Sequence, residues 1–275
     1  MSAVVHRFLT HDGDRPLTFG VVVDRRAEGA LRAADSIGAY AGIANNHPGA
    51  CAFGKISVIA RDGIHTFQAC ADGRTLPVFC GNSTAAALVA LGGEGQIESI
   101  VHGLGKAPCL VSADLTGTAA AQTWTVPDPA SCEIAWHGLP VILMHAFNDY
   151  AIVIGDLPEG CSPEAARHEL LGTCEDKKLA VIGATGDGGT LVRFYNANGL
   201  HGAAPHTGLA TIALAARKCG WFDAMLAAEP LHYQTAGGPR RAHLPRIEAV
   251  ADGRVTVHFP AIAVKFDPLV TDAAA

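Results

Sequence analysis

The sequence predicts an α+β fold of two pseudo-symmetric lobes, each with a sheet wrapped around one central buried helix. Short runs of apolar and β-branched residues, bounded by Gly, Pro or Asp, recur along the chain and are typical of strands. Two helical segments, at residues 83–91 and 207–218, are apolar on nearly every side, which is typical of buried helices. They lie roughly half a chain apart, so we expect each to form the centre of its own lobe.

The boundary between the lobes is expected near residues 126–133, where proline and serine cluster. This places the N-terminal lobe at residues 1–128 and the C-terminal lobe at residues 129–260. A last strand, within about residues 260–275, is expected to cross back and join the N-terminal lobe. A chain of 275 residues is long enough for two lobes of ordinary size.

The apolar runs predict a succession of short strands, and the glycine-rich run 183–189 is interpreted as a hairpin turn between two of them. A phosphate-binding loop would instead open a helix. The predicted strands are, in chain order, residues 19–23, 56–60, 76–79, 141–144, 151–154, 179–182, 191–195 and 255–259.

Helix ends carry recognisable signals. The helix at 83–91 has Asn82 or Ser83 as its N-cap and a glycine pair after its last turn. A helix at 162–171 begins with Ser, Pro and Glu, which supply a cap, a first-turn proline and an acid at the positive end of the dipole. The helix at 207–218 ends with Arg and Lys, as the C-terminal end of a helix favours.

Composition excludes several classes of partner. The formal net charge is −6 and no basic stripe is present, which argues against nucleic acid. No apolar stretch approaches the roughly 18 residues of a membrane span, and no export signal is recognisable, so we expect a cytoplasmic protein. A small carboxylate is the expected partner, and a homodimer would suit the apolar content.

The eight cysteines have irregular spacing, with neither a C-x-x-C pair nor a Cys/His cluster of zinc type. We therefore expect free thiols and no metal site. Each cysteine is by default a small buried hydrophobic residue, so a chemical role must be argued individually.

The starts of the two buried helices are candidate carboxylate sites. Free N–H groups and the helix dipole both favour an anion there, and small residues let a ligand approach the backbone. Two such starts facing one cleft between the lobes would hold a substrate with two carboxylates. Plain helix capping is the alternative explanation. The candidate binding residues are Gly81, Asn82 and Ser83 at the first start, and Thr207 and Gly208 at the second.

Cys80 and Lys55 are the candidate catalytic residues. Cys80 immediately precedes the first helix start, a position that favours a reactive thiolate. Lys55 opens an apolar strand, where desolvation would lower its pKa enough for it to act as a base. A surface lysine whose stem covers the strand is the alternative. His201 and His206 flank the second helix start as candidate binding residues, or as structural histidines.

Three motifs resemble the diaminopimelate epimerase-like proteins. Phe79-Cys80-Gly81-Asn82 is similar to the first cysteine motif of that fold, which includes proline racemase and the PhzF-type and PrpF-type isomerases. The second motif of the epimerases carries another cysteine, whereas His201 to Gly208 is closer to the PrpF pattern of His, Ala, Pro, Thr and Gly. Gly54 to Ile59 resembles the PrpF strand that carries a proton-transferring lysine. The PrpF arginine- and glycine-rich N-terminal stretch is scarcely preserved.

The resemblance implies an isomerase that needs no cofactor. PrpF-type enzymes move a double bond, or change its geometry, in small unsaturated polycarboxylates. By position, Lys55 matches the proton-transferring lysine, Cys80 the motif cysteine, and Thr207 and Gly208 the anion-binding helix start. The expected reaction is a 1,3-proton shift, in which Lys55 removes an allylic proton and Cys80 or Lys55 returns a proton to the far carbon.

Two other functions stay open. An amino-acid racemase or epimerase of the same fold would use Cys80 with an unusual second acid such as His206, since two-base racemisation needs an acid and a base on opposite faces of one carbon. A relative without catalytic activity would only bind a small acid.

Overall fold

The computed structural model divides the chain into two compact units. Unit 1 comprises Met1–Val126 with His258–Ala275, and unit 2 comprises Pro127–Val257. The lobes expected from the sequence are residues 1–128 and 129–260. Each unit is described by itself. The residues that the structure describes are 4–12, 15–28, 37–45, 54–70, 73–103, 107–173, 177–184, 190–202, 205–219, 231–235, 237–250 and 252–267.

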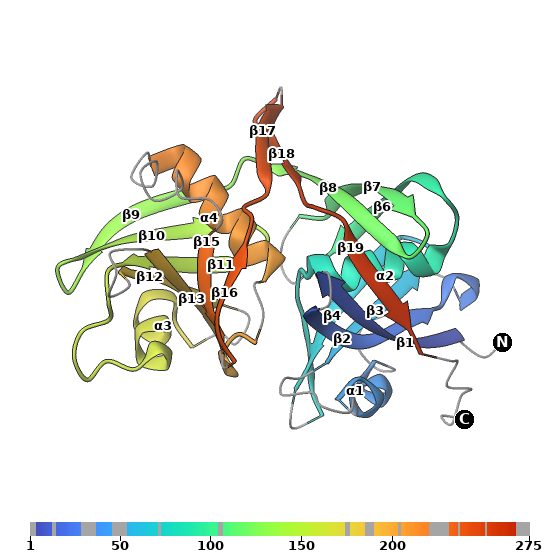
Figure 1. Ribbon diagram of the computed structural model, residues 1–275, viewed down its shortest axis with the longest axis horizontal. Helices are drawn as coiled ribbons and strands as arrows, with labels where there is room; N and C mark the ends of the chain where they lie inside the picture. Colours follow the sequence, from blue (N-terminus) through green and yellow to red (C-terminus); the bar gives the residue numbers. More distant parts are fainter. Residues whose placement is uncertain are drawn as a thin grey trace. The chain divides into compact units, whose positions relative to one another are not determined.

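Unit 1 is a closed ring of strands (Figure 1). Strands β8, β19, β1, β2, β3, β4, β6 and β7 pair in that order, and β7 also pairs with β8. The pairings are antiparallel except for β2 with β3 and β4 with β6, which are parallel. The strands are β1 (Val4–Asp12), β2 (Arg15–Asp24), β3 (Lys55–Ala60), β4 (Gly63–Ala69), β5 (Thr75–Pro77), β6 (Gly95–His102), β7 (Cys109–Thr116), β8 (Ala119–Pro127) and β19 (Ile262–Phe266).

Helix α2 (Gly81–Leu91) runs inside this ring. It contacts β1, β2, β3, β4, β6, β7 and β19, and every residue from Gly81 to Leu88 is buried. Only small side chains and a few aliphatic ones fit at such a position, which explains the run of Gly, Ser, Thr and Ala. The predicted central helix is confirmed, but its N-cap is Cys80, so Asn82 and Ser83 already lie in the first turn.

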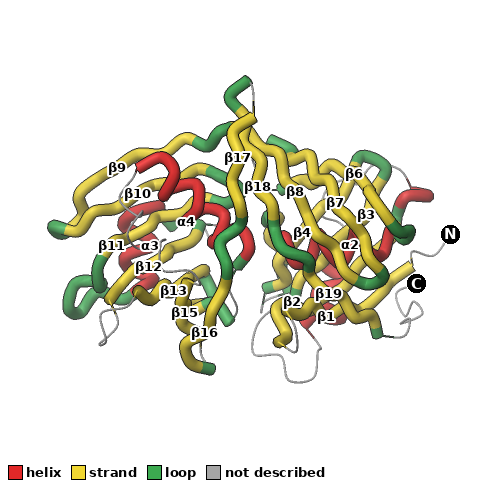
Figure 2. Tube along the Cα trace, turned by 45° about the horizontal axis from the view of Figure 1, so that its top comes forward, coloured by secondary structure: helices red, strands yellow, loops and turns green. Residues whose placement is uncertain are grey.

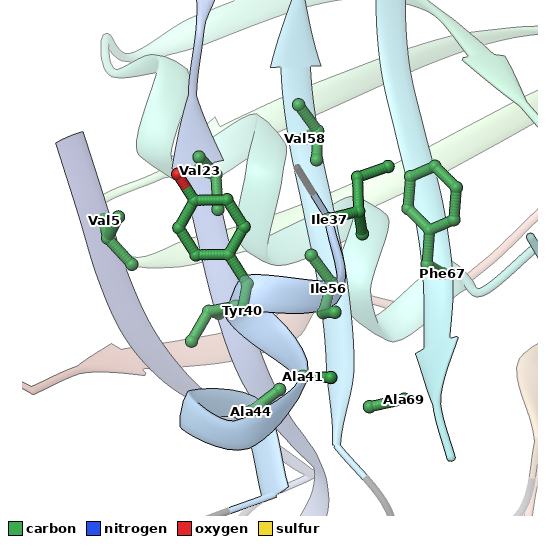
Figure 3. Packing of buried hydrophobic residues seen from close by; sticks show 11 residues of the cluster. Val5, Val23, Ile37, Tyr40, Ala41, Ala44, Ile56, Val58, Phe67 and Ala69 are labelled. Atoms are coloured by element: carbon green, nitrogen blue, oxygen red, sulfur yellow. The ribbon is translucent and has the colours of Figure 1, made fainter. Parts of the chain in front are cut away.

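Helix α1 (Gly38–Asn45) packs against β2, β3 and β4 and was not predicted. Figure 3 shows Ile37, Tyr40 and Ala44 against apolar side chains of these strands. In β3, Ile56 and Val58 face α1, while Ser57 between them donates a 2.9 Å hydrogen bond to a carbonyl of α2. Strand β3 is thus covered on both faces, which requires its near-continuous apolar sequence.

Unit 2 contains an open sheet in the order β16, β15, β13, β12, β11, β10 and β9, with β14 paired to β13 (Figure 2). Strands β17 and β18 pair with each other. The strands are β9 (Ala130–Trp136), β10 (Leu139–His145), β11 (Asp149–Ile154), β12 (Lys178–Ala184), β13 (Thr190–Asn196), β14 (Gly199–Leu200), β15 (Leu231–Thr235), β16 (Gly238–Ala242), β17 (Arg246–Val250) and β18 (Arg254–His258).

Both faces of the central strands of unit 2 are buried. Helix α3 (Pro163–Leu171) packs through Ala166 and Leu171 on a cluster that includes Val141 and Val153, and its N-cap Ser162 accepts a 3.1 Å bond from an amide of the first turn. Helix α4 (His206–Cys219) contacts β10 and β11, and every residue from Thr207 to Ala216 is buried. Two sheet-rich units, each with one enclosed helix, confirm the predicted α+β fold class.

Several sequence-based boundaries need correction. The strand predicted at 76–79 is β5, Thr75–Pro77, and Val78 just after it still donates its N–H to the Thr66 carbonyl of β4 at 2.9 Å. The predicted returning strand is β19, which pairs with β1 and β8 in unit 1. In the glycine-rich run 183–189, Ala184 pairs with Thr190, and residues 185–189 lie outside the described part of the chain.

Gly20 is required by a close approach of two backbones. It pairs with Lys55 in the parallel β2–β3 ladder, and a Cβ atom at Gly20 would lie 1.9 Å from the Lys55 carbonyl oxygen. We expect Gly20→Ala to reduce the free energy of unfolding by about 2 kcal/mol or more, because backbone rather than a flexible side chain must move. Chemical denaturation measures the change.

Gly42 provides the matched control. It is exposed within α1, and a Cβ there would meet nothing within 4 Å. Gly42→Ala should therefore raise the free energy of unfolding by about 0.5–1 kcal/mol through its higher helix propensity. Equal effects of the two substitutions would contradict the described packing of β2 on β3.

Candidate active site

Lys55 is held by strand pairing at the start of β3. Its antiparallel partner on β4 is Gln68, and the Lys55 ammonium donates a hydrogen bond to the Gln68 side-chain oxygen. The other end of the Gln68 amide donates to the carbonyl oxygens of Gly54 (3.2 Å) and Ala69 (3.0 Å). Because both N–H groups are used in this way, the amide oxygen is oriented toward Lys55.

Burial lowers the pKa of Lys55 below its ordinary value of 10.5. Charge interactions with Cys80 and Cys70 oppose this shift and only partly offset it. Within the described part of the chain, no carboxylate contributes to the pKa of this lysine. A lysine next to thiols and an amide, without a carboxylate, gives up its proton more readily than a surface lysine.

Cys80 lies where the extended chain turns into α2. Its carbonyl oxygen accepts the Thr84 amide at 2.9 Å, while its thiol makes no capping hydrogen bond. The turn is fixed on both sides. The Phe79 ring packs edge-on against Trp124, with ring centroids 6.1 Å apart, and Gln122 donates a 2.9 Å bond to the Gly81 carbonyl. The thiol is therefore anchored by its backbone and remains half-buried.

Asn82 carries an unsatisfied polar atom inside unit 1. The residue is 3% exposed, its Nδ2 donates to Thr18 Oγ1 at 2.8 Å, and its Oδ1 has no hydrogen-bond partner in the described part of the chain. Turning the amide over would exchange the two ends and leave the nitrogen unpaired instead. A buried polar atom without a partner costs about 1–3 kcal/mol, which a ligand group could recover.

Ser83 is completely buried and contributes to the structure of the helix start. Its hydroxyl donates a 3.3 Å bond to the Cys80 carbonyl, and its own carbonyl accepts the Ser57 hydroxyl. Lys55, Cys80, Gly81, Asn82 and Ser83 all belong to unit 1.

The second group of predicted residues belongs to unit 2, at the start of α4. The Thr207 hydroxyl accepts a 3.0 Å bond from Asn148. Gly208 is required by packing, because a Cβ there would lie 2.7 Å from both the Phe194 ring and Pro205. His201, half-buried, donates its backbone N–H to the Phe194 carbonyl at 2.7 Å.

His206 is the first residue of α4, and burial lowers its pKa to about 4. Its imidazole is therefore neutral across the physiological range. A neutral imidazole at a helix start can accept a proton but has none to give as an imidazolium.

Sequence reasoning missed Gln68, Cys70 and Asn148. Gln68 is a polar residue in an otherwise apolar strand, and only the β3–β4 register places it opposite Lys55. Cys70 follows the end of β4, so its effect on Lys55 also depends on this pairing. No helix in the described part of the chain is long and apolar enough to cross a membrane.

No protein-family model and no curated protein matches the sequence. Solved structures do share its fold. A predicted epimerase from Pseudomonas aeruginosa matches with a TM-score of 0.60 and 12% identity over 100% of both chains. A PhzF-family phenazine biosynthesis protein from Bacillus anthracis matches at 0.57 and 11%, over 99% of this chain and 100% of the other. A probable proline racemase from Agrobacterium radiobacter, with bound carbonate, matches at 0.56 and 11%, over 100% and 94%.

These matches show that the fold is diaminopimelate epimerase-like, as the three motifs implied. The finer resemblance to the PrpF-type proteins stays a prediction. At such low identity a shared fold does not identify the reaction, which must be argued from the residues of the site.

The buried His206 predicts an acid-sensitive unit 2. The unfolded chain takes up a proton at this imidazole near pH 6.5, whereas the folded chain does so only near pH 4. The unfolded state therefore binds more protons in that window, and stability falls as the pH drops through it. His206→Gln should flatten this part of the pH dependence of the free energy of unfolding, measured by denaturation at fixed pH values.

The control for this prediction is His243→Gln, because the His243 side chain is exposed. Its stability profile should follow that of the unsubstituted chain. A His206→Gln profile as steep as that of the unsubstituted chain between pH 6.5 and 4 would mean that folding does not lower the pKa of His206.

Proposed function

We propose that this protein is a cofactor-independent isomerase that catalyses a 1,3-proton shift in a small unsaturated carboxylic acid. The observation that carries the proposal is the setting of Lys55, a lysine of lowered pKa that interacts with Cys80 at the start of a buried helix and with Cys70 just after the end of β4. The fold shared with epimerases supports an enzyme of the isomerase class. The three motifs favour double-bond migration within that class.

In the proposed reaction, neutral Lys55 removes a proton from the allylic carbon of the substrate. The electron pair of the broken C–H bond enters the conjugated system, and negative charge develops on the carboxylate as a dienolate. The first N–H groups of a helix have no partner within the helix, so those of Gly81, Asn82 and Ser83 are suited to that charge. Cys80, or the Lys55 ammonium, then protonates the far carbon, and the double bond has moved.

Asn82 supports this placement of the carboxylate. Its amide has one buried end bonded to Thr18 and the other end without a partner. A substrate oxygen at the helix start would meet the amide nitrogen after the side chain turns over. Binding would then satisfy a polar atom that the protein alone leaves unpaired.

The start of α4 is proposed as the site of a second carboxylate. Thr207 and Gly208 are small, and the imidazole of His206 is neutral at physiological pH. His201 is proposed as a further binding residue. That both helix starts serve one substrate in a cleft between the lobes stays a prediction. A substrate with two carboxylates would lose affinity on substitution at either start, whereas a monocarboxylate would lose it at Asn82 alone.

A racemase or epimerase is the second candidate, favoured by the probable proline racemase among the matching structures. In this reaction one residue removes a proton from a carbon and another delivers a proton to its opposite face. The neutral state of His206 at physiological pH restricts it to the base in such a pair, so the acid would have to be Cys80.

Substitution of Lys55 should separate catalysis from stability. We expect Lys55→Met to lower turnover by about 10²–10⁴-fold, the usual worth of a general base. The melting temperature, measured in parallel, separates a loss of catalysis from a loss of folding. For the unsubstituted enzyme, activity should increase with pH through a midpoint below 10.5, because the neutral amine is the active form.

Lys265→Met is the matched control, because Lys265 is an exposed strand residue of the same unit. It should keep full turnover. Cys80→Ala should also reduce turnover, and Cys70→Ala shows whether the second thiol participates. Full activity of both Lys55→Met and Cys80→Ala would refute the assignment of the site.

Solvent-deuterium exchange distinguishes the three functions. Candidate acids are incubated with the protein in D₂O and followed by NMR. Allylic isomerisation introduces deuterium at two carbons of the substrate, because the proton leaves one carbon and returns to another. Epimerisation introduces it at one carbon with inversion. Tight binding without any exchange would identify a non-catalytic binding protein.

A further inference from the structure

Asp62, His65 and His102 form a cluster at one end of the β3–β4 hairpin. Asp62 lies in the turn between β3 and β4, His65 is the third residue of β4, and His102 is the last residue of β6. The parallel pairing of β4 with β6 places His65 directly opposite His102. Lys55 is at the other end of β3 from Asp62. Several strand residues, each spanning about 3.3 Å, lie between them, so the cluster is separate from the proposed catalytic residues.

The three side chains are already close to one another. His65 Nε2 is 3.1 Å from Asp62 Oδ1, and His102 Nε2 is 2.9 Å from the Asp62 carbonyl oxygen. The two imidazole rings are stacked, with centroids 4.3 Å apart and planes only 5° from parallel. One potential ligand atom from each residue lies within 4.8 Å of the others.

The backbone holds this arrangement in place. Gly63 follows Asp62 with φ +135°, and a Cβ there would lie 2.2 Å from the Ile100 carbonyl oxygen of β6. The turn is therefore packed tightly on β6, which fixes the spacing of Asp62 and His102. The neighbouring arginines are engaged elsewhere. Arg61 donates to the Arg26 carbonyl, and Arg26 forms a bidentate pair with Asp24.

The chemistry of the cluster matches a transition-metal ion. Imidazole nitrogens and carboxylate oxygens are ligands that Zn²⁺ prefers, at bond lengths of about 2.0–2.2 Å. The three donor atoms lie within 4.8 Å of one another, so their side chains must move closer together to bind one ion.

We propose that Asp62, His65 and His102 bind one divalent transition-metal ion of the Zn²⁺ class. The bound ion joins the β3–β4 turn to the end of β6, two parts of the ring of unit 1 that are distant in sequence. The sequence predicts no metal site, because the spacing of these residues in the chain resembles no zinc motif. The proposal departs from that expectation. It is independent of the proposed isomerase activity.

The test uses the whole chain, freed of metal with a chelator and kept under a reductant that does not bind metals. Zn²⁺ is titrated by calorimetry, and the melting temperature is followed in parallel. We expect about one equivalent to bind and to raise the melting temperature. His65→Asn and His102→Asn should each weaken binding by at least about tenfold, the lower end of what the loss of even a supporting group of a metal site costs.

His145→Asn is the matched control. His145 is an exposed histidine in contact with an aspartate, with 3.0 Å between His145 Nδ1 and Asp149 Oδ1, but it is not part of a three-residue cluster within the described residues. This variant should bind Zn²⁺ as the unsubstituted chain does. Unchanged affinity in both His65→Asn and His102→Asn would overturn the proposal, as would the absence of any binding.

Cobalt provides a readout that needs no variant. Co²⁺ bound by imidazole and carboxylate absorbs only weakly in the visible range, whereas thiolate ligands add strong charge-transfer bands in the near ultraviolet. The cluster predicts a spectrum without these bands at one equivalent of Co²⁺. Strong thiolate bands at that stoichiometry would assign the ion to cysteines and overturn the proposal, even if a histidine variant failed to fold.

Discussion

The enclosure of α2 by the strands of unit 1 is the constraint on which the rest of this unit depends. A helix surrounded by strands must present small or aliphatic side chains on all sides, and any polar group there must find a partner inside. Ser57 and Gln122 supply partners to carbonyl oxygens of the first turn. The enclosure also fixes where the helix begins, and hence where the thiol of Cys80 and the first free N–H groups lie.

The same enclosure accounts for what could be predicted from the sequence. A helix that is apolar on all sides is conspicuous, so α2 and α4 were recognised and their placement in two sheet-rich units followed. Helix α1 was missed because it is short, begins with glycine and carries no charged residue at either end. Strand β6 was missed because half of its residues are exposed and its pattern of apolar residues is weak.

The candidate site was predictable only as far as its residues are local in sequence. Cys80 and its neighbours were identified from their position before a buried helix, and Lys55 from the strand that it opens. Gln68 and Cys70 act on Lys55 through the β3–β4 register, and His102 reaches His65 through the pairing of β4 with β6. Such pairings between strands are set by the whole fold, and local sequence patterns do not encode them.

The return of β19 to unit 1 makes unit 2 an insertion between two adjacent strands of one ring. β8 ends at Pro127, where unit 2 begins, and β19 follows the end of unit 2 and pairs with both β1 and β8. During synthesis, the edges of β1 and β8 that pair with β19 therefore stay without this partner until nearly the whole chain has left the ribosome. Unpaired edges are the parts of a sheet most prone to wrong association. The ring around α2 can thus close completely only after all of unit 2 has been synthesised.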